Sequence, residues 1–247
     1  MLLRFISFRE RGQGMLYCMS DIHGEYEKYR KMLETIRFSD ADTLYVLGDM
    51  IDRGPAPVEV LQDVAARANV YPILGNHELM AREALRHLLV DVTEENAETH
   101  LRAEDLAALQ EWLQNGGETS LQGFRKLGKE ARADLLDFLC DLPLYETAEA
   151  GENAFVLVHA GLGNFQAGKP LSAYSAFDLV WAETSLSKRY FDDANTFLIV
   201  GHTPTMVLAG APKIYRCQNN FCIDCGAVFG GRLSCLRLDD FAEFYVE

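Results

Sequence analysis

The stretch Gly48-Asp49-Met50-Ile51-Asp52-Arg53-Gly54 identifies the fold that the rest of the chain follows. An apolar run of β-forming residues, 43–47, comes directly before it and has the length of a buried strand. Glycine, Pro55 and Pro57 then break the pattern. In open α/β sheets, ligands bind at the edge formed by the carboxyl ends of the strands. The sequence therefore predicts a strand over 43–47 that delivers two carboxylates and a guanidinium to this edge.

Four other strand-like runs end in turns of similar build. We expect strands over 15–20, 70–74, 154–158 and 197–200, with helices over 25–36 and 57–69 between the first three strands of the chain. This β-α-β-α-β order is typical of a layered α/β fold. The five strand ends carry Asp21 and His23; Asp49, Asp52 and Arg53; Asn76 and His77; His159; and His202.

Residues 79–142 show almost no strand pattern. Helices are expected over 80–89, 103–113 and 130–139, and Asn115-Gly116-Gly117 ends the second of them. Because strands with similar polar ends resume afterwards, we interpret 79–142 as a helical insertion in a single domain spanning 1–247. The insertion either caps an active site or is a purely structural layer. Farther on, we expect a short helix over 176–183, and antiparallel strands and hairpins over 221–246.

Composition excludes several functional classes. The chain has 247 residues and a net charge of -14, which argues against binding to a nucleic-acid backbone. No apolar run approaches the roughly 20 residues that span a membrane, and the N-terminus lacks a signal-peptide pattern. We therefore predict a cytoplasmic protein without nucleic-acid or membrane partners, whose oligomeric state the sequence leaves open. Met15 stands directly before the first strand, so we expect residues 1–14 to be an N-terminal appendage.

The cysteines offer an alternative metal or redox site. Four of the six lie near the C-terminus, including the pair Cys222-x-x-Cys225; the others in that part are Cys217 and Cys235. Cysteine zinc sites usually come as two paired clusters, which this chain lacks. Buried free cysteine is a common packing residue in β-rich sequence, so we favour packing while the role of the group stays open.

The histidines point to another chemistry. Four of the six lie at strand ends, whereas His87 and His100 fall in the helical insertion and receive no role. Carboxylate, amide oxygen and imidazole together are ligands for divalent metals. Two metals that share a carboxylate can activate a water for attack on phosphorus, and a guanidinium can hold the phosphate. An Asp beside a His makes that His a candidate general acid. These parts are those of metal-assisted phosphoester hydrolysis.

The order of these motifs resembles the phosphoprotein phosphatase branch of the calcineurin-like metallophosphoesterases, and in size its bacterial and phage members. The resemblance rests on Asp21-Ile-His23-Gly24, Gly48–Gly54, Gly75-Asn76-His77-Glu78, His159-Ala-Gly161 and Gly201-His202-Thr203. The later stretch 223–231 is also similar, with Cys225 in place of the usual Thr, which further weakens the zinc interpretation. The fold it implies is a four-layered α/β/β/α sandwich with two central mixed sheets.

The resemblance also implies a role for each motif residue. Asp21 and His23 would bind a first metal and Asp49 would bridge, with the second metal completed by Asn76, His159 and His202. Arg53 and Asn76 would hold the phosphate, and His77, paired with Asp52, would contact the phosphoester and protonate the leaving group. The implied cofactors are two divalent ions, manganese in bacterial relatives, with iron or zinc as alternatives.

One position departs from the family pattern. Bacterial relatives commonly carry a second phosphate-binding Arg two residues after a Trp, whereas this chain has Trp181-Ala182-Glu183. Glu would repel a phosphate dianion, so we expect the second clamp to be absent or supplied from elsewhere, with Lys188 and Arg189 as candidates. This change bears on the substrate more than on the class of reaction.

Three functions remain in view. The leading hypothesis is a two-metal protein phosphatase acting on phosphoserine or phosphothreonine, with phosphotyrosine as a wider specificity. The alternative is a hydrolase of nucleotides or dinucleoside polyphosphates, although diadenosine tetraphosphatases of the superfamily typically have Ala where this chain has Asp52. The third is a catalytically weak phosphopeptide-binding protein, supported only by Glu183. The expected substrate is thus a phosphoprotein or a small phosphoester.

Overall fold

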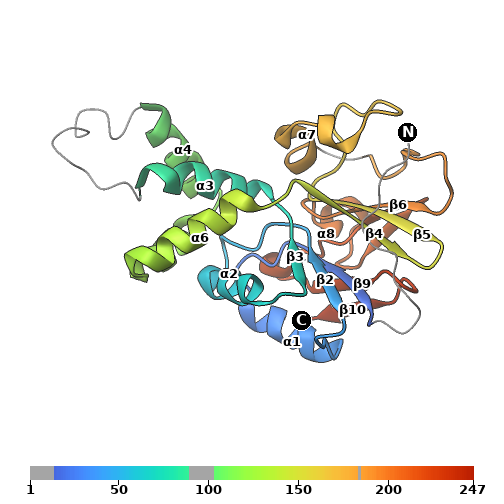
Figure 1. The fold of residues 1–247 in the computed structure, drawn as a ribbon, viewed down its shortest axis with the longest axis horizontal. Helices are drawn as coiled ribbons and strands as arrows, with labels where there is room; N and C mark the ends of the chain where they lie inside the picture. The colour runs from blue at the N-terminus through green and yellow to red at the C-terminus, as the bar shows by residue number, and fades with distance from the viewer. Residues whose placement is uncertain (1–13, 89–102, 183–184) are drawn as a thin grey trace.

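The computed structural model describes residues 14–88, 103–182 and 185–247 (Figure 1). The expected appendage, His100 and Glu183 therefore lie outside the described residues, apart from Gly14. The first sheet has the order β10-β9-β1-β2-β3. Its three parallel strands are β1 (Leu16–Met19), β2 (Thr43–Val46) and β3 (Val70–Pro72), and β9 (Leu233–Arg237) and β10 (Glu243–Val246) join antiparallel.

The second sheet has the order β4-β5-β6-β8-β7. Its parallel strands are β5 (Asn153–Val158), β6 (Thr196–Val200) and β8 (Asn220–Cys222), flanked by the antiparallel β4 (Tyr145–Ala150) and β7 (Tyr215–Cys217). Each sheet thus mixes parallel and antiparallel pairs. The carboxyl ends of three parallel strands in each sheet supply the edge on which the candidate site is built.

The two sheets pack face to face. Leu16 and Cys18 of β1 join the cluster between the sheets, together with Leu157 of β5 and Ile199 of β6. The next residues along β1, Tyr17 and Met19, point to the other face of the same sheet. Since side chains alternate along a strand and β1 is buried on both faces, its sequence is apolar throughout instead of alternating.

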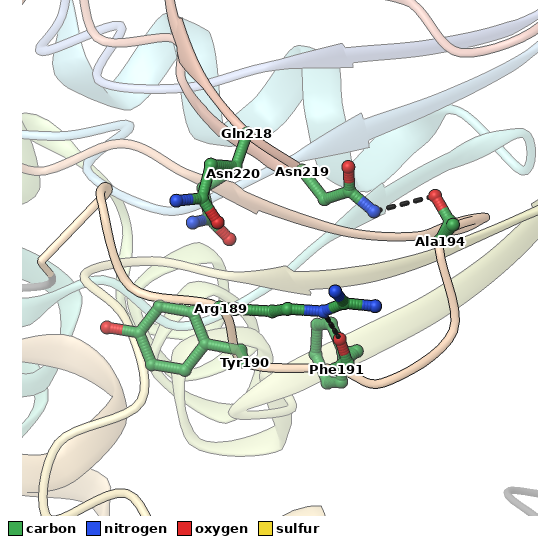
Figure 2. A pocket seen from close by; sticks show the side chains of 7 residues that line it. All are labelled: Arg189, Tyr190, Phe191, Ala194, Gln218, Asn219 and Asn220. Atoms are coloured by element: carbon green, nitrogen blue, oxygen red, sulfur yellow. Dashed lines mark hydrogen bonds between the residues drawn. The ribbon is translucent and has the colours of Figure 1, made fainter.

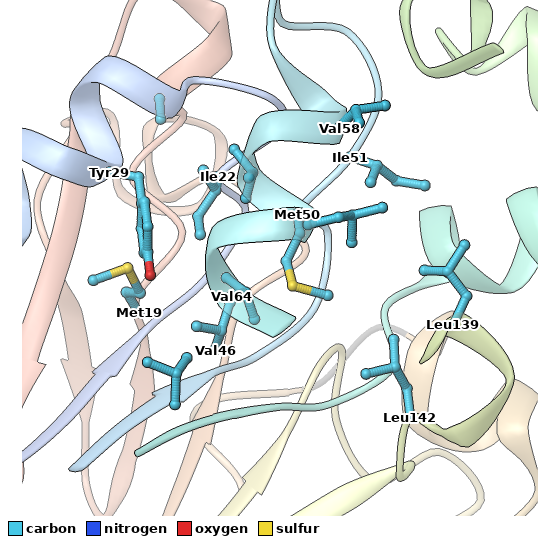
Figure 3. Close-up of a cluster of buried hydrophobic side chains, with 14 of the residues drawn as sticks. Met19, Ile22, Tyr29, Val46, Met50, Ile51, Val58, Val64, Leu139 and Leu142 are labelled. Carbon is cyan, nitrogen blue, oxygen red and sulfur yellow. The ribbon is translucent and has the colours of Figure 1, made fainter. Parts of the chain in front are cut away.

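Helices cover the two outer faces. α1 (Tyr26–Thr35) and α2 (Pro57–Ala66) pack on the first sheet, where Tyr29 and Val64 meet Met19 and Val46 (Figure 3). The 3₁₀ turn η1 (Leu171–Ala173) and α7 (Ala176–Val180) pack on the second sheet. The predicted four-layered α/β/β/α fold with two mixed sheets is confirmed.

Four helices lie between β3 and β4 in the chain. They are α3 (Asn76–Leu88), α4 (Ala103–Gln114), α5 (Glu118–Lys126) and α6 (Lys129–Asp141), and Figure 1 shows α3, α4 and α6 projecting to one side of the sheets. The sequence did not predict α5, and it predicted that α3 begins at residue 80. Asn76 to Glu78 are in fact the first residues of α3 and not a strand-end turn. None of the described helices has the length and hydropathy that a membrane crossing requires.

The C-terminal part differs from the predicted run of hairpins. β8 pairs in parallel with β6, and only β7 meets it as an antiparallel neighbour. The chain then crosses to the first sheet for β9 and β10. The unpredicted β4 contains Glu146 and Glu149, which disfavour a strand by propensity; pairing along its whole length with the buried β5 overrides that preference. The short helix α8 (Thr205–Ala209) was also not predicted.

Candidate active site

The structure brings the predicted strand-end residues of both sheets together. His159 follows β5 in the second sheet, yet its Nδ1 donates to the Leu47 carbonyl oxygen at the end of β2, over 2.6 Å. The backbone N–H of His202, which follows β6, donates to Asp21 Oδ2 over 3.0 Å. The carboxyl edges of the two sheets are therefore joined by side chains that were predicted from the sequence to lie at this edge.

Asp49 lies at the centre of this edge. Two groups of three residues have ligand atoms within 4.8 Å of one another, and Asp49 belongs to both. One group contains His23 and His77, whose Nε2 atoms lie 3.5 and 3.9 Å from Asp49 Oδ2. The other contains His159 and His202, and here His159 Nε2 lies 3.4 Å from Asp49 Oδ1. The two oxygens of one buried carboxylate thus face different groups.

Asn76 adds an amide oxygen to the second group. Its Oδ1 lies 2.9 Å from His159 Nε2 and 3.0 Å from His202 Nδ1, and these two nitrogens are 3.2 Å apart. Asp21 belongs to neither three-residue group in the described part of the chain. Its carboxylate lies beside Gly201, where an added Cβ would be 2.2 Å from Oδ2, so only glycine fits there.

The protonation of the imidazoles suits metal binding. Nδ1 of His23 donates to the Ile51 carbonyl oxygen over 2.9 Å, as His159 does to Leu47, so Nε2 of each ring is turned towards Asp49, and Nε2 of His23 also meets Arg53 Nη1. Burial, together with neighbouring positive groups, lowers the pKa of His77 to about 2 and that of His202 to about 3. Neutral rings are the form that binds a cation.

The buried acids need positive charge nearby. Burial, then Asp21 and Glu78, raise the pKa of Asp49 well above its usual value. His159 Nε2 lies 2.9 Å from Asn76 Oδ1 and 3.4 Å from Asp49 Oδ1, so three potential ligand atoms converge there. Among the residues that the structure describes, buried His77 Nε2 has no hydrogen-bond partner. Converging ligand atoms and the unpartnered lone pair of a neutral buried ring fit divalent cations, since buried polar atoms otherwise cost free energy.

His77 is held by Asp52. Nδ1 of His77 and Oδ2 of Asp52 are 2.7 Å apart, and neither side chain is exposed. Asp52 also accepts from Trp112 Nε1 over 2.8 Å and from Ser120 Oγ over 2.5 Å. Burial raises the pKa of Asp52 to about 7, and these two donors oppose that rise. Neither Trp112 nor Ser120 was predicted from the sequence as a site residue. The nearby turn Asn115-Gly116-Gly117 was interpreted only as the end of a helix.

Arg53 lies beside the first group of ligands. Its Nη1 is 2.5 Å from His23 Nε2, and its guanidinium carbon lies 5.1 Å from the centre of the Phe229 ring.

The residues expected to replace a second phosphate-binding arginine, Lys188 and Arg189, lie elsewhere. Arg189 donates to the carbonyl oxygens of Phe191 and Asp192 and lines a cavity of about 240 Å³ (Figure 2). This cavity lies at the amino ends of β6 and β8, whereas the candidate site lies at the carboxyl ends of the strands.

Lys188 is not near the site either. Its Nζ lies 4.4 Å from the centre of the Phe165 ring, and its carbonyl oxygen accepts from Asn220 at the start of β8. The hypothesis that Lys188 or Arg189 replaces the second phosphate-binding arginine was therefore wrong. It failed because nearness in sequence to Trp181 does not keep an irregular loop at the carboxyl edge.

Glu78 shapes the loop that carries Asp49. Its carboxylate accepts four backbone N–H groups, from Gly75 and Asp49 through Oε2 and from Met50 and Ile51 through Oε1, at 2.7–3.3 Å. An added Cβ at Gly75 would lie 2.3 Å from Asp49 Oδ1. The sequence showed Glu78 as part of a motif but gave it no role. In the structure it is the acceptor for a loop that no strand partner satisfies.

The backbone at the site is strained. Ten described non-glycine residues have left-handed φ angles, and six of them are Asp21, His23, Asp49, Asp52, Arg53 and His202. Such conformations cost on the order of 1–3 kcal/mol each and persist where surrounding contacts enforce them. Their concentration here indicates that side-chain direction is being held against backbone preference.

A further carboxylate lies at the end of β8. Asp224 is buried, accepts from the Gly226 N–H over 2.8 Å, and has a pKa raised well above its usual value by burial and then by Asp21.

The neighbouring cysteines pack instead of binding metal. Cys222 Sγ donates to the Thr203 carbonyl oxygen, and no cysteine belongs to a metal-capable group among the described residues. The structure does not support the alternative zinc site.

Comparisons with known proteins give consistent results. The family model for calcineurin-like phosphoesterases matches residues 15–217. The chain is 29% identical to serine/threonine-protein phosphatase 1 of Salmonella typhimurium, over 90% of this chain and 91% of that one. It is 33% identical to the symmetrical bis(5'-nucleosyl)-tetraphosphatase of an Acidovorax species, over 60% of this chain but 44% of that protein, so it spans less than half of that relative.

Solved structures resemble the fold. The crystal structure of a candidate diadenosine tetraphosphatase superposes with a TM-score of 0.63 at 18% identity, covering 96% of this chain and 94% of that one. A metallophosphoesterase from Sphaerobacter thermophilus gives 0.52 at 15% identity, with 95% and 89% covered. At such identities the likeness shows the fold alone.

We expect Glu78→Gln to destabilise the protein. The amide would present two donor hydrogens to backbone N–H groups that need acceptors, so we predict a loss of about 2–4 kcal/mol in the free energy of unfolding. Urea denaturation of both forms measures it. The matched control is Glu83→Gln on the same helix, where the side chain is 46% exposed and the change should be small. Equal stability of Glu78→Gln and the native chain would contradict the role of Glu78.

Proposed function

The chain belongs to the calcineurin-like phosphoesterases, a family of metal-dependent hydrolases, and from that membership we propose that it is a phosphoprotein phosphatase. The proposed substrates are phosphoserine and phosphothreonine, with phosphotyrosine as a wider specificity. The observation that carries the proposal is the buried pair of His77 and Asp52, joined over 2.7 Å, with His77 Nε2 left without a hydrogen-bond partner among the described residues. An alkoxide is a poor leaving group and gains most from a positioned acid.

The two groups around Asp49 support a pair of metal sites. From the first group we assign His23 and Asp49 to one divalent ion and add Asp21, which leaves His77 as the acid; we propose that Asp49, Asn76, His159 and His202 hold the other ion. When bound, such ions supply a water activated for attack and neutralise charge on the phosphoryl group. Manganese is the proposed ion, with iron or zinc as alternatives; the donor set of imidazole, carboxylate and amide oxygen admits all three.

Arg53, Asn76 and His77 are the proposed contacts to the phosphate. The Arg53 guanidinium can donate paired hydrogen bonds to phosphate oxygens, and its present contact is a neutral His23 nitrogen and not a carboxylate. Burial holds the His77 ring neutral, so the ring needs the charges of Asp52 and of a bound phosphate dianion to carry a second proton. That proton, at Nε2, is the one we assign to the leaving oxygen.

A symmetrical dinucleoside tetraphosphatase is the second candidate. It is favoured by relatives such as the Acidovorax protein and by the Proteus mirabilis tetraphosphatase, which is 25% identical over 91% of this chain and 94% of that one. A nucleoside diphosphate is a far better leaving group than an alkoxide and needs little protonation. The dedicated acid formed by His77 and Asp52 therefore favours the phosphatase.

The experiment that separates the two is a substrate panel with added manganese. The panel contains a phosphoserine peptide, a phosphotyrosine peptide, p-nitrophenyl phosphate and diadenosine tetraphosphate. We expect the phosphoserine peptide to give a higher kcat/KM than the dinucleotide. A preference for the dinucleotide would reverse the choice of substrate, and an absence of turnover with every compound would overturn hydrolase activity.

The role of His77 predicts a dependence on the leaving group. His77→Ala should lower kcat on the phosphoserine peptide about 10²- to 10⁴-fold, because the alkoxide then departs unprotonated. The same variant should retain most activity on p-nitrophenyl phosphate, whose phenolate is a good leaving group. Steady-state kinetics on both substrates check this. Equal losses would show that His77 is not the acid.

The bridging position of Asp49 predicts coupled metal sites. Asp49→Asn keeps the shape of the side chain but removes the charge that both groups share, so we expect weaker binding at both sites. Isothermal titration with Mn²⁺ gives the number of ions and their affinities. The matched control is Asp105→Asn in α4. Retention of two ions at unchanged affinity would contradict the assignment of Asp49.

A further inference from the structure

Two side chains of the helical segment between β3 and β4 hold the Asp52 carboxylate. Trp112 of α4 donates through Nε1 to Oδ2 over 2.8 Å, and Ser120 of α5 donates through Oγ to Oδ1 over 2.5 Å. Trp112, Ser120 and Asp52 are each 0% exposed. Because Oδ2 also accepts from His77 over 2.7 Å, both oxygens of the carboxylate have fixed partners.

The same segment holds the backbone of this loop. The Asp52 N–H donates to Ser120 Oγ over 2.9 Å, and the Arg53 N–H donates to the Gly116 carbonyl oxygen over 3.0 Å. Both residues have left-handed φ angles, 69° and 65°. Strained backbone of this kind persists only where other contacts enforce it, and here α4, α5 and the turn between them provide those contacts.

The turn between α4 and α5 sets the two donors. At Gly117 an added Cβ would lie 2.6 Å from the Trp112 ring, and at Gly116, with φ of +100°, it would lie 2.8 Å from Arg53 Cγ. Two glycines therefore let the turn pass between Trp112 and Arg53 and bring Ser120 back to Asp52. The close packing of this turn therefore contacts the Asp52 carboxylate and the loop that carries Asp52 and Arg53.

We propose that Trp112 and Ser120 are positioning residues for the reaction, which hold Asp52 so that the His77 ring directs Nε2 at the leaving oxygen. The proposal rests on the phosphatase function above. It assigns the helical segment a part in leaving-group protonation, where the sequence left open a cap or a structural layer. Without these donors the carboxylate turns about its Cβ–Cγ bond, and the ring that it orients is no longer fixed.

The test compares Ser120→Ala and Trp112→Phe with Thr119→Ala. Thr119 is the neighbour of Ser120 on α5, and its buried hydroxyl has no hydrogen-bond partner in the described part of the chain, so it controls for loss of a hydroxyl from this helix. We expect both variants to lower kcat on the phosphoserine peptide about 10- to 100-fold at unchanged KM. On p-nitrophenyl phosphate we expect changes below about threefold, and Thr119→Ala should match the native chain on both substrates.

A second measurement does not depend on turnover. The Nδ1 proton of His77, identified in ¹⁵N-labelled protein by its loss in His77→Asn, reports the hydrogen bond to Asp52. We expect this proton to exchange with water faster in Ser120→Ala than in the native chain, and at the native rate in Thr119→Ala.

The outcomes are distinct. If the native chain hydrolyses neither substrate, the phosphatase function fails, and proton exchange still decides the geometry. Equal losses of Ser120→Ala on both substrates, or kinetics and exchange that match those of Thr119→Ala, would overturn the proposal while leaving the phosphatase function intact. Trp112→Phe leaves a cavity, so Ser120→Ala decides the case if that variant does not fold.

Discussion

The position of the Asp49 carboxylate is the constraint on which the rest of the site depends. It is 2% exposed, and its two oxygens face two separate sets of imidazoles contributed by both sheets. A buried carboxylate with Asp21 and Glu78 close by is unfavourable unless positive charge compensates it. Because Nδ1 of His23 and Nδ1 of His159 both contact carbonyl oxygens, Nε2 of each ring is turned towards Asp49, which suits a cation on each side. The chemistry proposed for this family member follows from that arrangement.

Two supports from outside the strands hold the loop in place. Glu78 binds the backbone at the Asp49 end, and the helical segment binds it at the end of Asp52 and Arg53. Both ends contain residues with left-handed backbone. The sheets therefore bring the proposed metal-binding and acid–base groups to one edge, and the contacts of α3, α4 and α5 decide where the side chains point. In the proposed function, substrate preference depends on these contacts, because protonation of the leaving group by His77 requires its ring to be fixed.

The fold and the residues that meet at the site could be predicted because each buried parallel strand is recognisable from a short apolar run in the sequence. Asp49, His159 and His202 each follow an apolar run, and the carboxyl ends of such strands meet by the rules of sheet packing. The contacts of Trp112 and Ser120 have no such sequence pattern, since their partner Asp52 is 60 and 68 residues away in sequence. Strand β4 was missed because its stability comes from pairing with β5 and not from its own composition. Arg189 was misplaced because loops between strands have no periodicity to fix their course.

The most direct test of this account is anomalous X-ray diffraction from crystals grown with Mn²⁺. We expect two anomalous peaks, about 3.5–4 Å apart, with the Asp49 carboxylate between them. One peak should lie against His23 and the other against Asn76, His159 and His202. A single peak, or two peaks that do not share Asp49, would contradict the claim that this carboxylate organises the site.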